Sequence, residues 1–143
     1  MPSSATDLIV ISFHWGIEKA YKQSYAQTYL AHYAIDNGAD LILGHHPHVL
    51  QGIELYKNKY IVYSLGNFVF GGNSNPSDKD SMIFQIEYKF DESRLIDTIV
   101  NIYPISISSK ENINDYRPTI LTDEEYERVL RKIDKYSIGI NLK

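Results

Sequence analysis

Two short apolar runs, separated by a helical segment, constrain the fold of this chain more than any other feature. Leu8–Phe13 reads LIVISF and Leu41–Leu43 reads LIL. The β-branched content and length of LIVISF predict a strand that is buried on both faces, and LIL is interpreted as the next strand. The segment 24–37 between them predicts a helix, and this order predicts a parallel strand pair with a right-handed crossover. The apolar face of that helix is predicted to comprise Ala26, Tyr29, Leu30, Tyr33 and Ala34.

The middle of the chain predicts further strands. Tyr60–Ser64 is interpreted as a third strand. Ser81–Phe90 alternates apolar and polar residues, which is typical of an antiparallel strand with one exposed face. A longer β region spans Leu95–Ile107, where Pro104 indicates an edge or a bulge. Together these segments predict a β-meander after the strand–helix–strand unit.

A terminal helix is predicted from Thr122 to about Tyr136. Thr122 and Glu125 have the spacing of a capping box at its start. Its predicted apolar face comprises Tyr126, Val129, Leu130 and Ile133. The chain is therefore predicted to form one α/β domain over 1–143, a βαβ unit followed by a β-meander and a C-terminal helix.

Composition excludes several classes of function. The chain has 143 residues, a net charge of −4 and no basic run, which argues against nucleic acid as a partner. It contains no cysteine, so disulfides and thiolate metal sites are excluded. No stretch approaches the roughly 20 apolar residues of a transmembrane helix, and the first residues lack the features of a signal peptide.

Three of the five histidines fall within Gly44–His48, at the end of the second predicted strand. In an extended H-x-H segment, His46 and His48 would point to the same side because side chains alternate. His14 follows the first predicted strand, and parallel strands end at the same edge of a sheet. The pattern predicts that these three histidines converge as ligands for Zn²⁺, Mn²⁺ or iron. The alternative is surface histidines beside a turn.

Further polar residues near the predicted strand ends have open roles. Glu18 could accept an N–H from a ligating histidine or act as a helix-start acid. His45 could orient a neighbour or face solvent. Glu54 could hold a backbone group or a substrate. Asn67 could supply an oxygen or fix its own loop, and mid-helix His32 is interpreted as structural.

Three motifs occur in order along the chain: FHWGIE, GADLILGHHPHVLQGIE and YIVYSLGNFVF. In this order and spacing they resemble the bacterial CapA family of capsule synthesis proteins, which are linked to poly-γ-glutamate. The resemblance is close over 7–70, extends to 107, and leaves 108–143 as a linker and terminal helix. It implies part of a calcineurin-like metallophosphoesterase fold, a sandwich of two sheets flanked by helices.

The resemblance implies specific roles for the histidines. It implies His14, His46 and His48 as ligands rather than His45, whose position is often Ser or Thr in the family. It also implies one or two divalent ions (Mn, Zn or Fe) in an intact site, and a metal-dependent, phosphoesterase-like hydrolase activity. Glu18 and Asn67 match motif positions to which it assigns no role.

The chain departs from the family pattern in what it lacks. Family members begin with a strand that carries a G-D segment and continue through N-L-E and N-N-H motifs, none of which occurs here. We therefore expect the later part of the domain, with an incomplete metal site. The resemblance implies a cell-envelope location and, as partners, an anionic polymer or capsule synthase components. The alternative functions are a non-catalytic binding module and self-association as a homo-oligomer through an exposed sheet.

Overall fold

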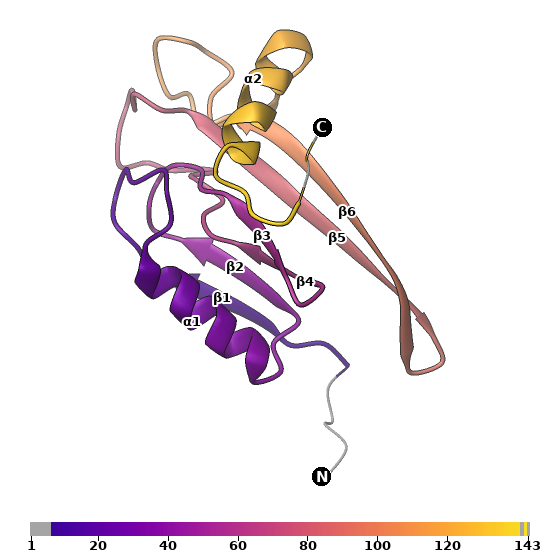
Figure 1. The fold of residues 1–143 in the computed structure, drawn as a ribbon. Coiled ribbons are helices and arrows are strands. Elements are labelled where there is room, and N and C mark those ends of the chain that lie inside the picture. Colours follow the sequence, from indigo (N-terminus) through magenta and orange to yellow (C-terminus); the bar gives the residue numbers. More distant parts are fainter. Residues whose placement is uncertain (1–6, 141, 143) are drawn as a thin grey trace.

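The computed structural model describes residues 7–140 and residue 142, which form two sheets and two helices (Figure 1). The elements in chain order are β1 (Val10–His14), α1 (Tyr25–Asp36), β2 (Leu41–His45), β3 (Ile53–Tyr56), β4 (Lys59–Val62), β5 (Asp80–Asp91), β6 (Arg94–Ser106), β7 (Thr119–Ile120) and α2 (Asp123–Asp134). The first sheet has the strand order β1-β2-β4-β3, and the second has the order β5-β6-β7. One apolar cluster lies between the first sheet and α1, and a second joins both sheets to α2. The predicted α/β class is confirmed.

The strand–helix–strand unit at the start of the chain is also confirmed. β1 and β2 pair in parallel, with His14 beside His45 at their carboxyl ends, and β2 pairs in parallel with β4. A capping box formed by Ser24 and Gln27 begins α1. Gly38 follows its end with a φ of +105°, the left-handed conformation expected there. The three parallel strands therefore bring the loops that follow them to one edge of the sheet.

The predicted apolar face of α1 was wrong except for Ala34, which packs against the core cluster. The structure buries Gln27 and Ile35 against the first sheet, whereas Tyr29 and Tyr33 are 57% and 60% exposed. The side-chain amide of Gln27 donates a buried hydrogen bond to Gln51, with 2.8 Å between Nε2 and Oε1. Because this partner satisfies the amide, a polar residue can occupy the core position and the tyrosines lie on the outer surface.

β1 was predicted to be buried on both faces but is an edge strand. Among the described strands it pairs with β2 alone. Ile11 and Phe13 pack against the cluster beneath α1, while Val10 is 51% exposed and His14 is also exposed. The second sheet does not reach over this strand (Figure 1). A short apolar run does not reveal how far a neighbouring layer extends, so the sequence could not show this.

β3 was missed by the sequence interpretation. It pairs antiparallel with β4 through a two-residue turn formed by Lys57 and Asn58. Both turn residues have a positive φ, +49° and +62°, as a type I′ turn requires. Glycine, which usually marks such turns, is absent from this one.

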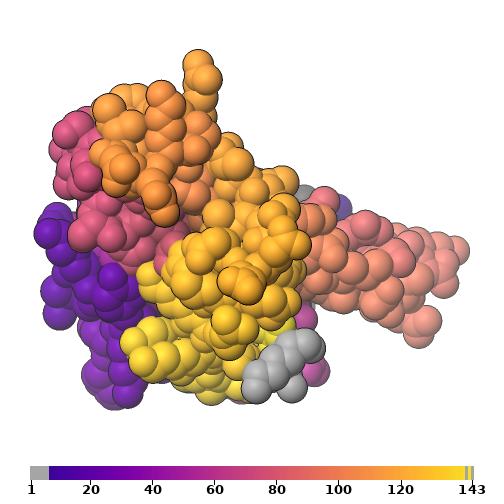
Figure 2. Space-filling view, turned by 90° about the horizontal axis from the view of Figure 1, so that it is seen from above, coloured from indigo at the N-terminus to yellow at the C-terminus, as the bar shows by residue number. Residues whose placement is uncertain are grey.

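β5 and β6 form the antiparallel pair that the alternating pattern predicted. Their hairpin extends well beyond the rest of the molecule (Figures 1 and 2). Its register shifts between Lys89 and Phe90 rather than at Pro104. The Tyr88 hydroxyl donates to the Asp40 carbonyl at 3.4 Å, which joins the hairpin to the first sheet.

α2 buries Val129 and Ile133 from its predicted apolar face. The predicted capping box is wrong, because the Thr122 side chain makes no cap hydrogen bond. Glu125 instead forms an ion pair with Arg128, one turn further along. Among the described residues, neither helix is long and apolar enough to cross a membrane.

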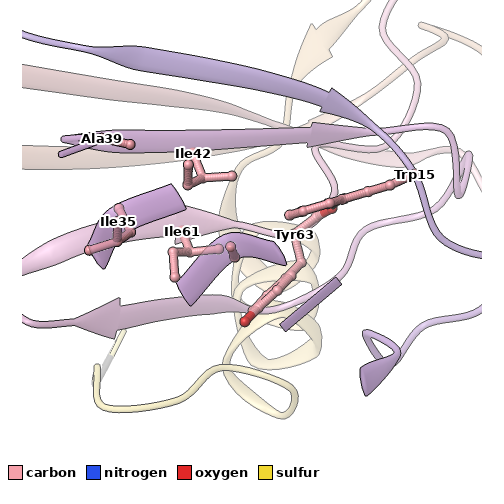
Figure 3. Packing of buried hydrophobic residues seen from close by; sticks show 7 residues of the cluster. Trp15, Ile35, Ala39, Ile42, Ile61 and Tyr63 are labelled. Carbon is pink, nitrogen blue, oxygen red and sulfur yellow. Dashed lines mark hydrogen bonds between the residues drawn. The ribbon is translucent and has the colours of Figure 1, made fainter. Parts of the chain in front are cut away.

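The core beneath α1 fixes the ends of the three parallel strands (Figure 3). Trp15, directly after β1, is buried beside Tyr63, directly after β4. Its indole Nε1 donates to the Tyr63 carbonyl at 2.9 Å. Gly44 of β2 makes this approach possible, because a Cβ there would lie 2.0 Å from the same carbonyl oxygen. The loops that leave these strands therefore start from a rigid base.

Candidate metal centre

The loops after β1 and β2 are joined by backbone hydrogen bonds. The Trp15 N–H donates to the carbonyl of His45 at 3.0 Å. The Lys19 N–H donates to the carbonyl of Pro47 at 2.7 Å. The histidine segment is thereby held alongside the segment 14–20, and side chains from both can meet.

Three side chains from these loops bring potential ligand atoms together. One atom each from Glu18, His46 and His48 lies within 4.8 Å of the other two. Ligands about 2.1 Å from a shared ion lie at most about 4.2 Å apart, so small side-chain adjustments would suffice. Two imidazoles and one carboxylate are a common donor set for zinc and iron. The sequence interpretation offered Glu18 a supporting role, whereas the geometry makes it a candidate ligand.

His14 lies beside this group. Its ring centroid is 4.7 Å from that of His46, with 44° between the ring planes. It is not one of the three residues whose ligand atoms are mutually close. The structure therefore brings all three predicted histidines into one neighbourhood, with His14 outside the group of three mutually close ligand atoms.

The histidine segment is a turn, so the predicted extended H-x-H conformation was wrong. His46 has a φ of +97° and His48 a φ of +59°, a region that favours glycine. The ring centroids of the two residues lie 5.9 Å apart. Non-glycine residues keep such backbone angles only where their surroundings enforce them, and they cluster at functional sites.

Asn67 determines which nitrogen of His48 can bind a metal. Asn67 Oδ1 lies 2.7 Å from His48 Nδ1, and Asn67 Nδ2 donates to the His48 carbonyl at 3.3 Å. A carbonyl can only accept, so the amide NH₂ faces it and the amide oxygen faces the ring. Nδ1 must then carry the hydrogen, which leaves the Nε2 lone pair free for an ion.

A hollow of about 250 Å³ opens beside the group. Its lining includes Glu18, Lys19, His48, Asn67 and Phe70. The Phe70 ring forms a wall, with its centroid 4.8 Å from that of His48. The sequence interpretation missed Lys19 and Phe70, although both directly neighbour or terminate the recognised motifs. Their shared position depends on loop conformation, which local sequence patterns do not reveal.

His45 and Glu54 lie outside the three-residue group. Glu54 is buried on β3, where Oε1 lies 2.9 Å from His32 Nε2 and Oε2 accepts from the Tyr63 hydroxyl at 2.6 Å. Burial and this carboxylate hold the pKa of Tyr63 well above its usual range. Both carboxylate oxygens are used inside the core, so we leave Glu54 out of the centre.

Comparison with known families and proteins identifies related chains. The model of the family described as bacterial capsule synthesis protein PGA_cap matches residues 2–72, which contain Glu18, His46, His48 and Asn67. The chain is similar to the capsule biosynthesis protein CapA of Bacillus anthracis, with 40% identity over 144 residues, 96% of this chain and 34% of that protein. It thus spans about a third of that relative's length.

Two further relatives match shorter segments. The PGA biosynthesis protein CapA of Bacillus subtilis is 45% identical over 83 residues, 58% of this chain and 22% of that protein. A probable polyglutamine synthesis accessory protein of Mycobacterium tuberculosis is 36% identical over 63 residues, 44% of this chain and 17% of that protein. The two Bacillus relatives share the name CapA, and the Mycobacterium relative is named for polyglutamine synthesis.

Proposed function

Because the chain belongs to the CapA family of bacterial capsule synthesis proteins and carries part of its domain, we propose that it serves capsule or poly-γ-glutamate synthesis through a divalent metal centre. Glu18, His46 and His48 would hold the ion, and His14 lies beside them. The observation that supports this proposal is the approach of three donor atoms to within 4.8 Å of one another.

The donor set fits a divalent ion on chemical grounds. Neutral imidazoles and a carboxylate suit Zn²⁺, Mn²⁺ and Fe²⁺. Asn67 holds the His48 ring with Nε2 free, as the partners of metal-ligating histidines commonly do. When bound, such an ion supplies Lewis acidity to a substrate oxygen.

We propose metal-dependent hydrolysis, phosphoesterase-like in type, as the reaction class of the intact domain. Three protein donors leave coordination positions for a substrate and for further ligands. The chain spans only 34% of the Bacillus anthracis relative. We therefore expect metal binding but little or no turnover from this chain alone.

Metal binding by matched variants tests this proposal. Elemental analysis and thermal shift with Mn²⁺, Zn²⁺ or Fe²⁺ would compare the wild type with the double variant His46→Ala/His48→Ala. At an ion concentration 100 times the Kd, the wild type should gain about 2.7 kcal/mol of stability, and the double variant should gain almost none. His45→Ala is the control, because His45 is the adjacent histidine and lies outside the group. Equal metal binding by wild type and double variant would refute the centre.

A further inference from the structure

We propose that the hollow beside the candidate metal centre receives an oxyanion of the substrate. Lys19 would recognise the negative charge, and Asn114 would be the positioning residue that holds the wall of the hollow. This inference rests on the proposed function, because it takes the neighbouring Glu18, His46 and His48 as the metal ligands.

Lys19 is a cation without a carboxylate partner in the described part of the chain. The ion pairs there involve His32, Lys57, Lys59, Lys89, Arg128, Arg131 and Lys132. The backbone of Lys19 has a φ of +60° and its N–H is bound to the Pro47 carbonyl. This lysine therefore lines the hollow from a fixed backbone position and has its charge available for a ligand.

A larger hollow, which shares Ser77 and Asp78 with the smaller one, is a weaker candidate. It has a volume of about 610 Å³ and lies beside Arg128 and Lys132. Arg128 pairs with Asp80 at 2.7 Å, and Lys132 pairs with both Asp78 and Asp80 at 2.7 Å. An anion could bind these cations only by displacing carboxylates that already neutralise them.

The size of the smaller hollow indicates what it can hold. Pockets for drug-sized ligands have roughly 300–1,000 Å³, and this one has about 250 Å³. Phe70 and Val49 give it apolar surface, and Asn73 adds an amide. Two carboxylates also line it: Glu18, which is one of the proposed metal ligands, and Asp78, which is paired with Lys132 at 2.7 Å. A carboxylate or phosphate on a group about as large as one amino acid fits this lining better than a long polymer segment does.

Asn114 fixes the loop that forms the wall. This residue is 2% exposed. Its Nδ2 donates to the carbonyls of Phe70 at 2.9 Å and Asn73 at 3.3 Å, and its N–H donates to the Ser74 carbonyl at 2.6 Å. Three hydrogen bonds from one buried residue thus hold 70–74, and with it the Phe70 ring against His48.

The segment that presents Asn114 is itself held by hydrogen bonds. Asp115 Oδ1 accepts from the Ser108 hydroxyl and the Ser109 N–H, both at 3.0 Å. Asp115 Oδ2 accepts from the Ser109 hydroxyl at 2.6 Å. These bonds, led by those from Ser109, hold the pKa of Asp115 well below its usual range. Asn114 therefore reaches the wall from an ordered loop.

Anion binding by metal-loaded protein tests the role of Lys19. Calorimetric titrations would use inorganic phosphate and the dipeptide γ-glutamyl-glutamate as probes. Lys19→Ala should weaken binding about 10-fold, the scale of one charge-assisted hydrogen bond. Lys22→Ala is the control, because Lys22 is exposed and does not line the hollow. If Lys19→Ala loses affinity for phosphate alone, the oxyanion is a phosphate, and if it loses affinity for the dipeptide alone, the oxyanion is a carboxylate. A loss of affinity for both probes supports one binding site for either group.

Two results would overturn the role of Lys19: equal affinities in Lys19→Ala and Lys22→Ala, or no binding of either probe by the wild type. Metal affinity is measured in the same proteins. If the wild type binds no metal, the proposed function fails and the titrations are repeated without metal. Binding that still depends on Lys19 then supports the hollow on its own.

The role of Asn114 has a separate readout. Asn114→Ala should weaken anion binding and speed amide hydrogen exchange in 70–74, while the metal affinity stays within about 2-fold of the wild type, because the metal ligands lie on other loops. Asn114→Asp keeps the size of the side chain but replaces the donating NH₂. It should therefore have the same two effects, and it takes the place of the alanine variant if that variant folds poorly. Unchanged exchange and anion affinity in the variant that folds would remove Asn114 from the proposal.

Discussion

The side-chain amide of Asn67 makes two hydrogen bonds to His48, one to the imidazole ring and one to the backbone carbonyl. The ring nitrogen Nδ1 lies 2.7 Å from Asn67 Oδ1, and Asn67 Nδ2 donates to the carbonyl of His48 at 3.3 Å. The loop after β4 therefore sets both the hydrogen position and the orientation of a ring in the loop after β2.

Removing this amide should weaken metal binding without removing a ligand. We expect Asn67→Ala to lower metal affinity about 10- to 100-fold, as is typical when the partner of a metal-ligating histidine is lost. Competition with a chromophoric chelator would measure the change. Asn101→Ala is the control, because Asn101 is exposed on β6 and bonds to Gln85. Wild-type affinity in Asn67→Ala would show that His48 needs no orienting partner.

Gly44 should tolerate no side chain. A Cβ at this position would lie 2.0 Å from the Tyr63 carbonyl oxygen and 2.6 Å from Trp15 Nε1. We expect Gly44→Ala to lower the free energy of unfolding by about 3 kcal/mol, because overpacking forces the strands apart. Urea denaturation would measure this loss. Gly71→Ala, where a Cβ meets nothing within 4 Å, should change stability by no more than about 0.5 kcal/mol.

The ion pairs that join α2 to β5 should make stability depend on acid pH. Burial alone would raise the pKa of Asp80, but hydrogen bonds from Arg128 and Lys132 outweigh it and hold this pKa below its ordinary value. The unfolded chain then binds the proton more readily than the folded one. The stabilisation is complete above the unfolded-state pKa of about 3.9 and is lost as pH falls through the lower, folded-state pKa.

Arg128→Ala should reduce both the stability and this acid dependence. We expect a loss of about 1–2 kcal/mol at pH 7, less than for a fully buried pair because the Arg128 side chain is 45% exposed. Urea denaturation between pH 3 and pH 7 would show a shallower decline than in the wild type. Arg131→Ala provides the comparison, since its pair with Glu127 is exposed and 3.9 Å long. Identical pH profiles for the two variants would exclude Asp80 as the source.

The turn conformation of His46 predicts that a glycine variant at this position is more stable than an alanine variant, the reverse of the usual order. With a φ of +97°, His46→Gly should be about 1 kcal/mol more stable than His46→Ala, because glycine adopts this conformation without strain. At His45, the last residue of β2, the order should reverse, with glycine about 0.5–1 kcal/mol less stable than alanine. Urea denaturation of the four metal-free proteins would test both. Glycine less stable than alanine at both positions would contradict the left-handed backbone.

The parts of the fold that the sequence could predict are those that depend on local patterns. LIVISF and LIL, with a helical segment between them, predicted the parallel pair. The same reasoning placed His14 and His46 near one sheet edge, and their ring centroids lie 4.7 Å apart. The carboxyl ends of neighbouring parallel strands lie at the same edge of the sheet. The proximity of the two histidines could therefore be predicted without knowledge of side-chain packing.

The features that the sequence could not predict depend on partners distant along the chain. The buried face of α1 includes Gln27 because Gln51, 24 residues later, satisfies its amide. Glu54 belongs to the core because His32 and Tyr63 occupy its two oxygens. In each case a polar residue is placed by a tertiary contact that composition and periodicity do not encode.

The left-handed turn also bears on how this protein can change over generations. Glycine at positions 46 and 48 would relax the chain but would delete the two imidazoles. A protein that does not need those rings would gain folding stability by replacing them with glycine. A protein that keeps them has a lower folding stability than its fold would allow. Under the proposed metal centre, the histidine turn is a trade-off in which the chain keeps two imidazoles at some cost in folding stability.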